Sequence, residues 1–318
     1  MSNMQYVTRN AQSLDSPSEA AGPRSRYKRN HQHPPAIRLR LRDLEILDAL
    51  KDYRFLTALQ VKAFFFKSIH KARKRLFLLS QNKYLERLFL PPAMGEGSPF
   101  AIYALANKGV RWLVTSTGLD RDAIGQTTPK SRASYLFIEH TLRRNDFRLA
   151  LTLACEEIPD IELLFWKQDK SIKSVVSFAN GRTGQFHKIA IFPDGFFGLR
   201  CQDRGFYYFL EIDRGTVDSK RMLLRFKAYL QSWLQRTCVK HYGIPNFRVL
   251  IVTTSEPRME SLMKTARKAV EGNPGSNLFL FTTFDRYSIE KPESILGPVW
   301  RTALSDDNAC HSLLGRPA

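Results

Sequence analysis

Apolar residues recur at helical spacing along the first part of the chain. In RLRDLEILDALKDYRFL, which begins at Arg40, leucine and isoleucine return every three or four positions, a pattern typical of an amphipathic helix. A second helix is predicted in ALQVKAFFF, with Thr57 as its N-cap, and a third in IHKARKRLFLLSQNKYL, with Ser68 as its N-cap. The strand-like runs YLERLFLP and FAIYAL follow, and the Gly, Pro and Ser residues between them predict a hairpin.

This order of elements predicts a winged helix-turn-helix over residues 37–110. In that arrangement the third helix enters the major groove of duplex DNA and the two-stranded ribbon lies along the backbone. A solvated helix face is the alternative explanation for the cations of the third helix. The residues predicted to contact DNA are the cations of the third helix and the ribbon: Lys71, Arg73, Lys74, Arg75, Lys83 and Arg87.

The pattern changes after a polar stretch over residues 111–131, which we interpret as a linker. A long helical segment comes first, and then strands and helices alternate: IELLFWK, FHKIAIFPDGFFGL and GFYYFLEID, a helix in SKRMLLRFKAYLQSWLQ, the strand FRVLIVTT, a helix from Glu256 and the strand NLFLFTTF. FRVLIVTT has no polar alternation, which indicates burial on both faces. We therefore predict an α/β fold (α+β overall) with a mixed sheet flanked by helices over residues 132–290, and a tail over residues 291–318.

Two carboxylates end the most apolar of these strands, FYYFLEID. Side chains alternate along a strand, so Glu211 and Asp213 share one face and Arg214 lies on the other. Asp194, in FPDGFF, is predicted to lie in a tight turn at the end of the preceding strand, and a hairpin of the two strands would bring it to Glu211. Carboxylates that converge repel one another until a cation neutralises them, and Mg²⁺ or Mn²⁺ prefers such oxygen ligands.

Such a metal can activate water for phosphodiester cleavage. Two structural explanations stay open beside it. PDG is also an ordinary turn signature, with Gly195 at the strained position. The acids can instead form a rim of salt bridges to Arg214, Lys220 or Lys227.

The charge of the chain points to a polyanionic partner. The 318 residues include 49 Lys and Arg against 30 Asp and Glu, a formal net charge of +19, and double-stranded DNA is the first candidate. Residues 1–36 are predicted to form a disordered basic arm, which either attracts phosphates or is a solvated tail. We expect a cytoplasmic protein with no membrane partner, because we find no apolar run of about 18 residues or more and no apolar leader. The four cysteines are scattered without a CxxC pair, so reduced thiols are expected.

Several of these motifs resemble known families. PD at 193–194 followed by EID at 211–213 is similar to the motif of the PD-(D/E)xK nucleases, whose core has the same order of helices and strands. More narrowly, EHTLRRND at 139–146, PDGFF, and FLEIDRGT followed by FKAYL resemble the replication-relaxation family over about residues 40–255. Members of that family occur on plasmids and other mobile elements and are associated with replication and relaxation of DNA.

The resemblance implies roles for the acids. Asp194 and Glu211, with Glu139 as a third, would be metal ligands, and Asp194, Glu211 and Asp213 would be the catalytic acids. Asp213 stands where the nuclease motif has lysine, so Lys220 or Lys227, two turns apart on the next helix, would have to replace it.

We therefore expect a DNA-binding protein of a mobile element. Two alternatives stay open: an active Mg²⁺-dependent DNA endonuclease, and a transcriptional regulator whose second domain serves assembly. A second copy of the chain, in a homodimer, is a possible partner under each of these interpretations. In EHTLRRND, His140 and Asn145 are each a candidate for a functional role, with a structural role as the alternative.

Overall fold

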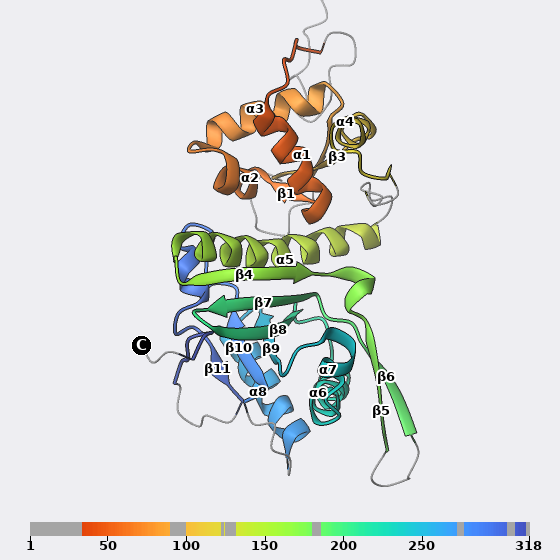
Figure 1. The fold of residues 1–318 in the computed structure, drawn as a ribbon, viewed down its shortest axis with the longest axis vertical. Helices are drawn as coiled ribbons and strands as arrows, with labels where there is room; N and C mark the ends of the chain where they lie inside the picture. Colours follow the sequence, from red (N-terminus) through yellow and green to blue (C-terminus); the bar gives the residue numbers. More distant parts are fainter. Residues whose placement is uncertain are drawn as a thin grey trace, which may run out of the picture.

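The computed structural model describes residues 34–89, 100–121, 124, 132–179, 186–271, 277–303 and 309–315. Most of the predicted basic arm and the loop between the ribbon strands, residues 90–99, lie outside these ranges. The fold is mixed α/β, as predicted. An N-terminal unit lies on a long helix, and that helix covers one face of a larger sheet (Figure 1).

The N-terminal unit has the predicted order of three helices followed by two paired strands. Its elements are α1 (Leu41–Tyr53), β1 (Leu56–Thr57), α2 (Ala58–Phe65), α3 (Ile69–Gln81), β2 (Leu85–Phe89) and β3 (Ala101–Leu105), and the strands pair antiparallel in the order β1-β3-β2. Thr57 caps α2 as predicted, because its hydroxyl accepts from the backbone N–H of Gln60 at 3.2 Å while the Gln60 side chain accepts from the backbone N–H of Thr57 at 2.8 Å.

A fourth helix, α4 (Asn107–Thr117), takes up the first part of the segment that we predicted to be a linker. It forms because Val110 and Leu113 pack into the core of the N-terminal unit. It ends at Gly118, whose φ of 70° is the left-handed conformation that favours glycine. The prediction that a linker begins at residue 111 is therefore wrong for residues 111–117, which belong to α4.

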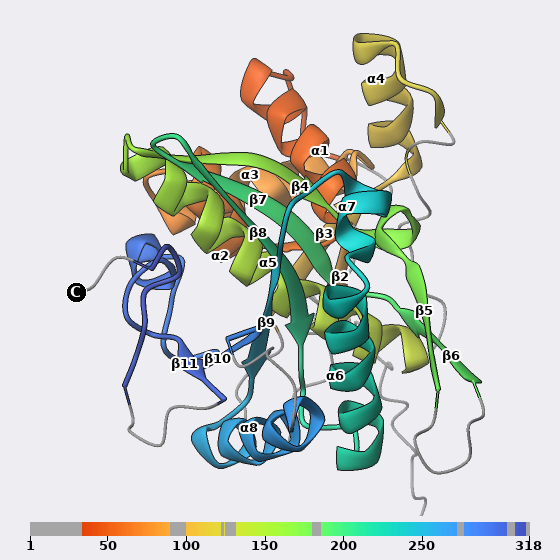
Figure 2. The same cartoon turned by 60° about the horizontal axis from the view of Figure 1, so that its bottom comes forward.

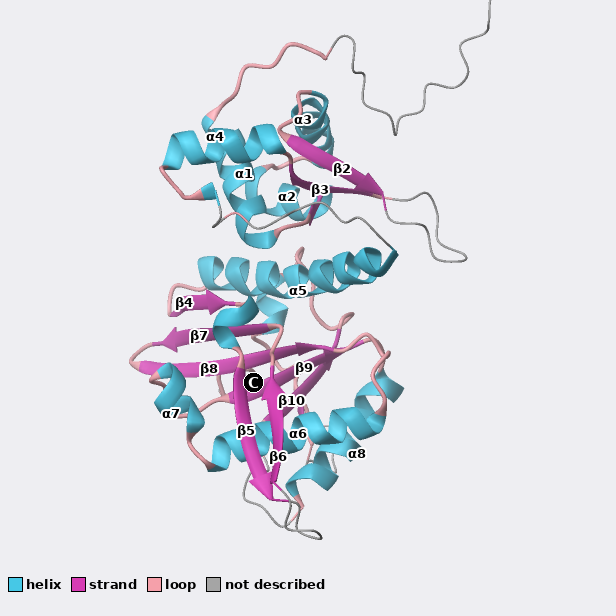
Figure 3. Ribbon diagram, turned by 90° about the vertical axis from the view of Figure 1, so that its right-hand side faces the viewer, coloured by secondary structure: helices cyan, strands magenta, loops and turns pink. Residues whose placement is uncertain are grey.

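Helix α5 (Arg132–Glu157) lies between the N-terminal unit and the larger sheet (Figure 3). Ile138 and Leu142 on one side pack with Phe55, Ile102 and Ala104 of the N-terminal unit. The other side packs on the sheet through Phe147, Ala150, Leu151 and Ala154. Because both sides are buried, α5 fixes the N-terminal unit on the second half of the chain.

The larger sheet has six strands in the order β11-β10-β9-β8-β7-β4. They are β4 (Ile161–Lys167), β7 (Gly195–Cys201), β8 (Arg204–Ile212), β9 (Arg248–Thr253), β10 (Phe279–Thr283) and β11 (Arg301–Thr302). β8, β9 and β10 are parallel and the other pairs are antiparallel. Helices α6 (Ser219–Leu234), α7 (Thr237–Tyr242) and α8 (Glu256–Val270) cover the face opposite α5 (Figure 2). None of the described helices is long and apolar enough to cross a bilayer.

The segment FHKIAIFPDGFFGL, predicted as one strand, forms two. β6 (Phe186–Ile191) pairs with β5 (Ser174–Ala179) in a separate hairpin, and β7 begins only at Gly195. Gly195 is not among the residues with a positive φ, so the strained turn that we considered for PDG is absent from this described segment. Glycine is needed because a Cβ there would lie 2.8 Å from Cζ2 of Trp166.

The described part of the predicted C-terminal tail belongs to the fold. It includes the 3₁₀ turn η3 (Pro292–Ile295) and β11, which pairs with β10. Trp300 is fully buried, and its indole N–H donates to the carbonyl of Ile295 at 2.8 Å. The apolar residues of this C-terminal segment are too sparse to show a helical or strand period, so the sequence did not predict that the segment is part of the fold.

Candidate nucleic-acid interface and acidic rim

The outward side of α3 carries exposed cations, as predicted. Lys71, Arg73 and Lys74 are exposed, whereas Ala72 and Leu76 on the opposite side are fully buried. Because the apolar side of α3 packs into the core, these three cations point away from it. Lys83 is also exposed, in the turn that follows α3, where its φ is 65°.

Arg75 does not share this outward side, contrary to our prediction. It is half-buried and directed at α1, where its Nε donates to Oδ1 of Asp43 at 2.7 Å and a second nitrogen bonds the other carboxylate oxygen. The same guanidinium donates to the carbonyl of Arg38 at 2.8 Å. Asp43 is only 1% exposed, so this ion pair is part of the core of the N-terminal unit.

Arg87, on β2, lies over two aromatic rings. Its guanidinium carbon is 4.9 Å from the centroid of Phe89 and 5.7 Å from that of Phe77, which is an exposed residue of α3. The predicted contact residue on the ribbon is thus held against the predicted contact helix.

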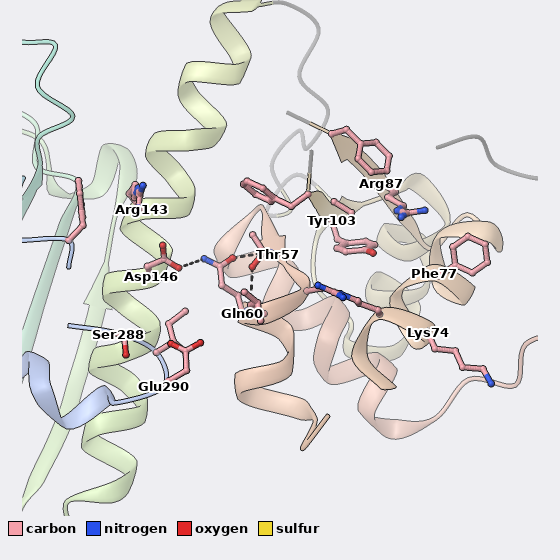
Figure 4. A pocket seen from close by; sticks show the side chains of 18 of the residues that line it. Thr57, Gln60, Lys74, Phe77, Arg87, Tyr103, Arg143, Asp146, Ser288 and Glu290 are labelled. Atoms are coloured by element: carbon pink, nitrogen blue, oxygen red, sulfur yellow. Dashed lines mark hydrogen bonds between the residues drawn. The ribbon is translucent and has the colours of Figure 1, made fainter. Parts of the chain in front are cut away.

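A groove of about 880 Å³ begins at this surface and extends to α5 (Figure 4). The N-terminal unit contributes Arg73, Lys74, Phe77, Arg87, Phe89, Phe100 and Tyr103, and the second half of the chain contributes Arg143, Asp146, Phe284, Tyr287 and Glu290. Gln60 crosses between the two sides and donates to Oδ1 of Asp146 at 2.7 Å. The sequence did not reveal the groove, because no local pattern shows which faces of two units meet.

Asn145 joins the two halves of the chain. Its amide nitrogen donates to the carbonyls of Tyr53 at 3.0 Å and Phe55 at 2.7 Å, and the residue is 1% exposed. Gln168 adds a bond to the carbonyl of Asp52 at 2.8 Å. The last residue of α1 and the turn after it are therefore fixed by side chains from the second half.

Of the acids predicted to converge, Asp194 and Glu211 lie together at the rim of the sheet. Asp194 precedes β7, and its backbone N–H bonds the carbonyl of Leu210 at 2.8 Å, beside Glu211 at the end of β8. One oxygen of Asp194 lies 2.7 Å from Nε2 of His140, and the other accepts from the backbone N–H of Ile212 at 2.7 Å. The predicted hairpin is confirmed, because β7 pairs antiparallel with β8. The predicted position of Asp194 at the end of the first strand is wrong, because Asp194 lies before the beginning of β7.

Glu211 is almost fully buried and has two partners on α6. Tyr229 donates its hydroxyl to one oxygen at 2.6 Å, and Arg225 donates to the other at 2.8 Å. Burial raises the pKa of Glu211 to about 7; the charge of Arg225 opposes this, while that of Asp194 adds to it. The carboxylate of Asp194 is thus near enough to influence the ionisation of Glu211.

Asp213 is held by another pair of donors. Thr253 donates to it at 2.7 Å, and the guanidinium of Arg258 on α8 forms two bonds at 2.9 and 3.0 Å. Arg214 lies on the other face, as predicted, and pairs with Glu139 of α5 at 3.0 Å. Gly215 follows with a φ of 75°, which explains the glycine in DRGT.

The cation beside Glu211 is Arg225, whereas Lys220 is exposed and Lys227 is half-buried. Sequence reasoning missed Arg225, although its four-residue spacing from Tyr229 places both on one face of α6. In the parts of the chain that the structure describes, no group of three or more His, Cys, Asp and Glu side chains is arranged to hold a metal ion.

The family comparison covers both of these surfaces. The family model described as replication-relaxation matches residues 47–247, which include the N-terminal unit from the second half of α1 onward, α5, and the acids Asp194, Glu211 and Asp213 of the rim. Comparison with curated proteins and with solved structures gave no match. Since the match covers more than half of the 318 residues, the chain belongs to the replication-relaxation family.

Proposed function

We propose that this protein binds duplex DNA through a winged helix at residues 37–110 and acts in replication or relaxation of a plasmid or other mobile element. The observation that carries the proposal is the outward side of α3. Lys71, Arg73 and Lys74 are exposed there, on the third helix of the unit and next to a two-stranded ribbon. In a winged helix this helix enters the major groove.

The charge of the chain supports the same partner. Each phosphate neutralised by Lys or Arg releases counterions, so a cationic helix face gains affinity for DNA that falls steeply with salt. The net charge of +19 attracts a polyanion such as DNA at long range and so increases the rate of association. Arg75 is excluded from this contact set, because its guanidinium is bound to Asp43.

The test is the salt dependence of duplex binding in a triple variant, Lys71→Ala, Arg73→Ala and Lys74→Ala. The slope of log K against log salt should decrease by about 1 for each phosphate contact removed. The control removes three exposed cations from the opposite end of the molecule: Lys240→Ala, Lys264→Ala and Lys268→Ala. If both variants have the same slope, α3 is not the duplex-binding surface.

A metal-dependent endonuclease is the second candidate, because Asp194 and Glu211 meet at the rim. An ion of the Mg²⁺ or Mn²⁺ type would bind between them and could activate water for phosphodiester cleavage. To reach the carboxylates it would have to displace Arg225 and Tyr229 from Glu211 and His140 from Asp194. Lys220 or Lys227 would have to approach the rim to act as the missing lysine.

Melting with and without Mn²⁺ tests this candidate. A bound ion should raise the melting temperature by mass action, and Asp194→Asn with Glu211→Gln should abolish that rise. Supercoiled plasmid incubated with Mg²⁺ or Mn²⁺ reports nicking in the same samples. If Mn²⁺ leaves the wild-type melting temperature unchanged and no nicks form, the acids act as a salt-bridge rim.

A further inference from the structure

The groove between the N-terminal unit and α5 exposes apolar side chains that a folded protein usually covers. Leu59 is 53% exposed, Phe77 39% and Phe100 52%, and all three line this groove. Phe284 and Tyr287 line its other side. Exposed aromatic surface gathered in one concave place indicates a binding site.

Cations lie among these aromatic side chains. Arg143, exposed on α5, lies over the ring of Phe284 at 4.9 Å, as Arg87 does over Phe77 and Phe89 on the other side. Arg73 and Lys74 line the end of the groove at α3.

Two acids also line the groove, but the groove keeps an excess of positive charge. Burial raises the pKa of Asp146 to about 6, and the Gln60 amide bonds this carboxyl group. Glu290 is exposed at the side formed by the second half of the chain. Against these two stand the four cations Arg73, Lys74, Arg87 and Arg143.

We propose that this groove binds an unpaired nucleic-acid strand, with bases stacked on its aromatic side chains and phosphates at its cations. Proteins that bind single strands combine a positively charged groove with aromatic platforms, because every base has a face that can stack. A volume of about 880 Å³ is of the size that encloses a small ligand, so it admits a few nucleotides of one strand but not a duplex.

This inference rests on the proposed function, because the groove continues the duplex-binding surface proposed above. Arg73 and Lys74 belong to both, so a strand that separates from a duplex on α3 enters the groove without leaving a cationic surface. The excess of cations favours a polyanion over an apolar peptide, and disfavours the basic N-terminal segment of this chain as the occupant.

The test compares an unstructured thymidine oligomer with a duplex of equal length by fluorescence anisotropy. The variant Arg143→Ala with Phe284→Leu changes only the side of the groove remote from α3. Its affinity for the oligomer should decrease about tenfold, the effect of losing one stacking platform and one cation. Its affinity for the duplex should stay at the wild-type value. Lys240→Ala with Val239→Ala, which removes an exposed cation and an exposed apolar side chain on α7, is the matched control.

A second measurement locates the strand. An oligomer carrying iodouracil should crosslink on irradiation to aromatic residues of the groove, which peptide mass spectrometry identifies. If the Phe284→Leu substitution lowers stability, the single change Arg143→Ala, at an exposed residue, still tests the cation.

The two proposals fail differently. Duplex binding without oligomer binding, or oligomer affinity that the groove variant leaves unchanged, overturns the strand site and leaves the duplex proposal standing. Oligomer affinity that the groove variant leaves unchanged would also be expected if the groove binds an apolar peptide instead of a nucleic-acid strand. Oligomer binding that the groove variant weakens, with no duplex binding at all, overturns the duplex proposal instead.

Discussion

His140 and Asp194 connect α5 to the rim of the sheet, with Nε2 of the histidine 2.7 Å from Oδ1 of the aspartate. The same helix carries Asn145, whose amide bonds the N-terminal unit at Tyr53 and Phe55. The motif EHTLRRND therefore contacts both the sheet rim, through His140, and the N-terminal unit, through Asn145. One residue orients an acid at the end of the sheet, and the other fixes the position of the predicted DNA-binding unit.

The first prediction concerns this joint. Asn145→Ala removes the side-chain donor to the buried carbonyl of Phe55 and one of the two donors to that of Tyr53, which keeps the backbone N–H of Phe55. The free energy of unfolding should fall by about 1–3 kcal/mol. Hydrogen exchange should become faster at residues 53–57, where α1 ends. Asn82→Ala is the matched control, because Asn82 also bonds two carbonyls, those of Pro35 and Leu78, but within the N-terminal unit. Equal exchange at residues 53–57 in both variants would contradict a role for Asn145 as the joint.

The second prediction concerns pH. Burial raises the pKa of Glu211 from its ordinary value of 4.5 to about 7, so between these values the folded chain holds a proton that the unfolded chain has lost. Folding stability should therefore fall as pH rises through this window and level off above it. Glu211→Gln should remove the part of this dependence that lies between pH 6 and 7 and should reduce the slope below pH 6, measured as the urea midpoint against pH.

Asp146 adds a dependence of the same sign and of similar size at lower pH, because burial raises its pKa from 3.8 to about 6. The Glu211→Gln variant should thus keep a slope below pH 6, which Asp146→Asn removes. Parallel curves for wild type and Glu211→Gln would show that Glu211 does not hold the proton.

Much of the fold follows from local pattern. The stripes of α1 and α3, the doubly apolar run of β9 and the hairpin that brings Asp194 to Glu211 were predicted, because each depends on a period or on pairing between neighbouring strands. The partners of the acids were not predicted. Arg225 reaches Glu211, and Arg258 reaches Asp213, only because α6 and α8 pack on one face of the sheet. That packing is set by contacts between elements distant in the sequence.

A third prediction tests the C-terminal segment. Trp300 is fully buried, and its ring meets that of Phe147 edge-on with 6.3 Å between centroids. Trp300→Ala should lower the free energy of unfolding by about 3–5 kcal/mol, as expected when a buried aromatic side chain leaves a cavity. Trp112→Ala, at a half-buried residue of α4, should cost less. A chain ending at residue 290 that melts like the full chain would show that the segment adds nothing to stability.

The last prediction separates two neighbouring cations of α3. Arg75 neutralises a carboxylate that is 1% exposed, so Arg75→Ala leaves Asp43 buried and without its cation. Removing one partner of a buried pair costs about 3–5 kcal/mol, and the variant should unfold at correspondingly lower urea concentration. Lys74→Ala should leave that midpoint unchanged, because Lys74 is exposed, and should instead weaken duplex binding. Asp43→Asn with Arg75→Met, which removes both charges together, should recover part of the stability lost in Arg75→Ala. If Arg75→Ala keeps wild-type stability but binds DNA less tightly, Arg75 faces the duplex in solution, and its ion pair with Asp43 does not form there.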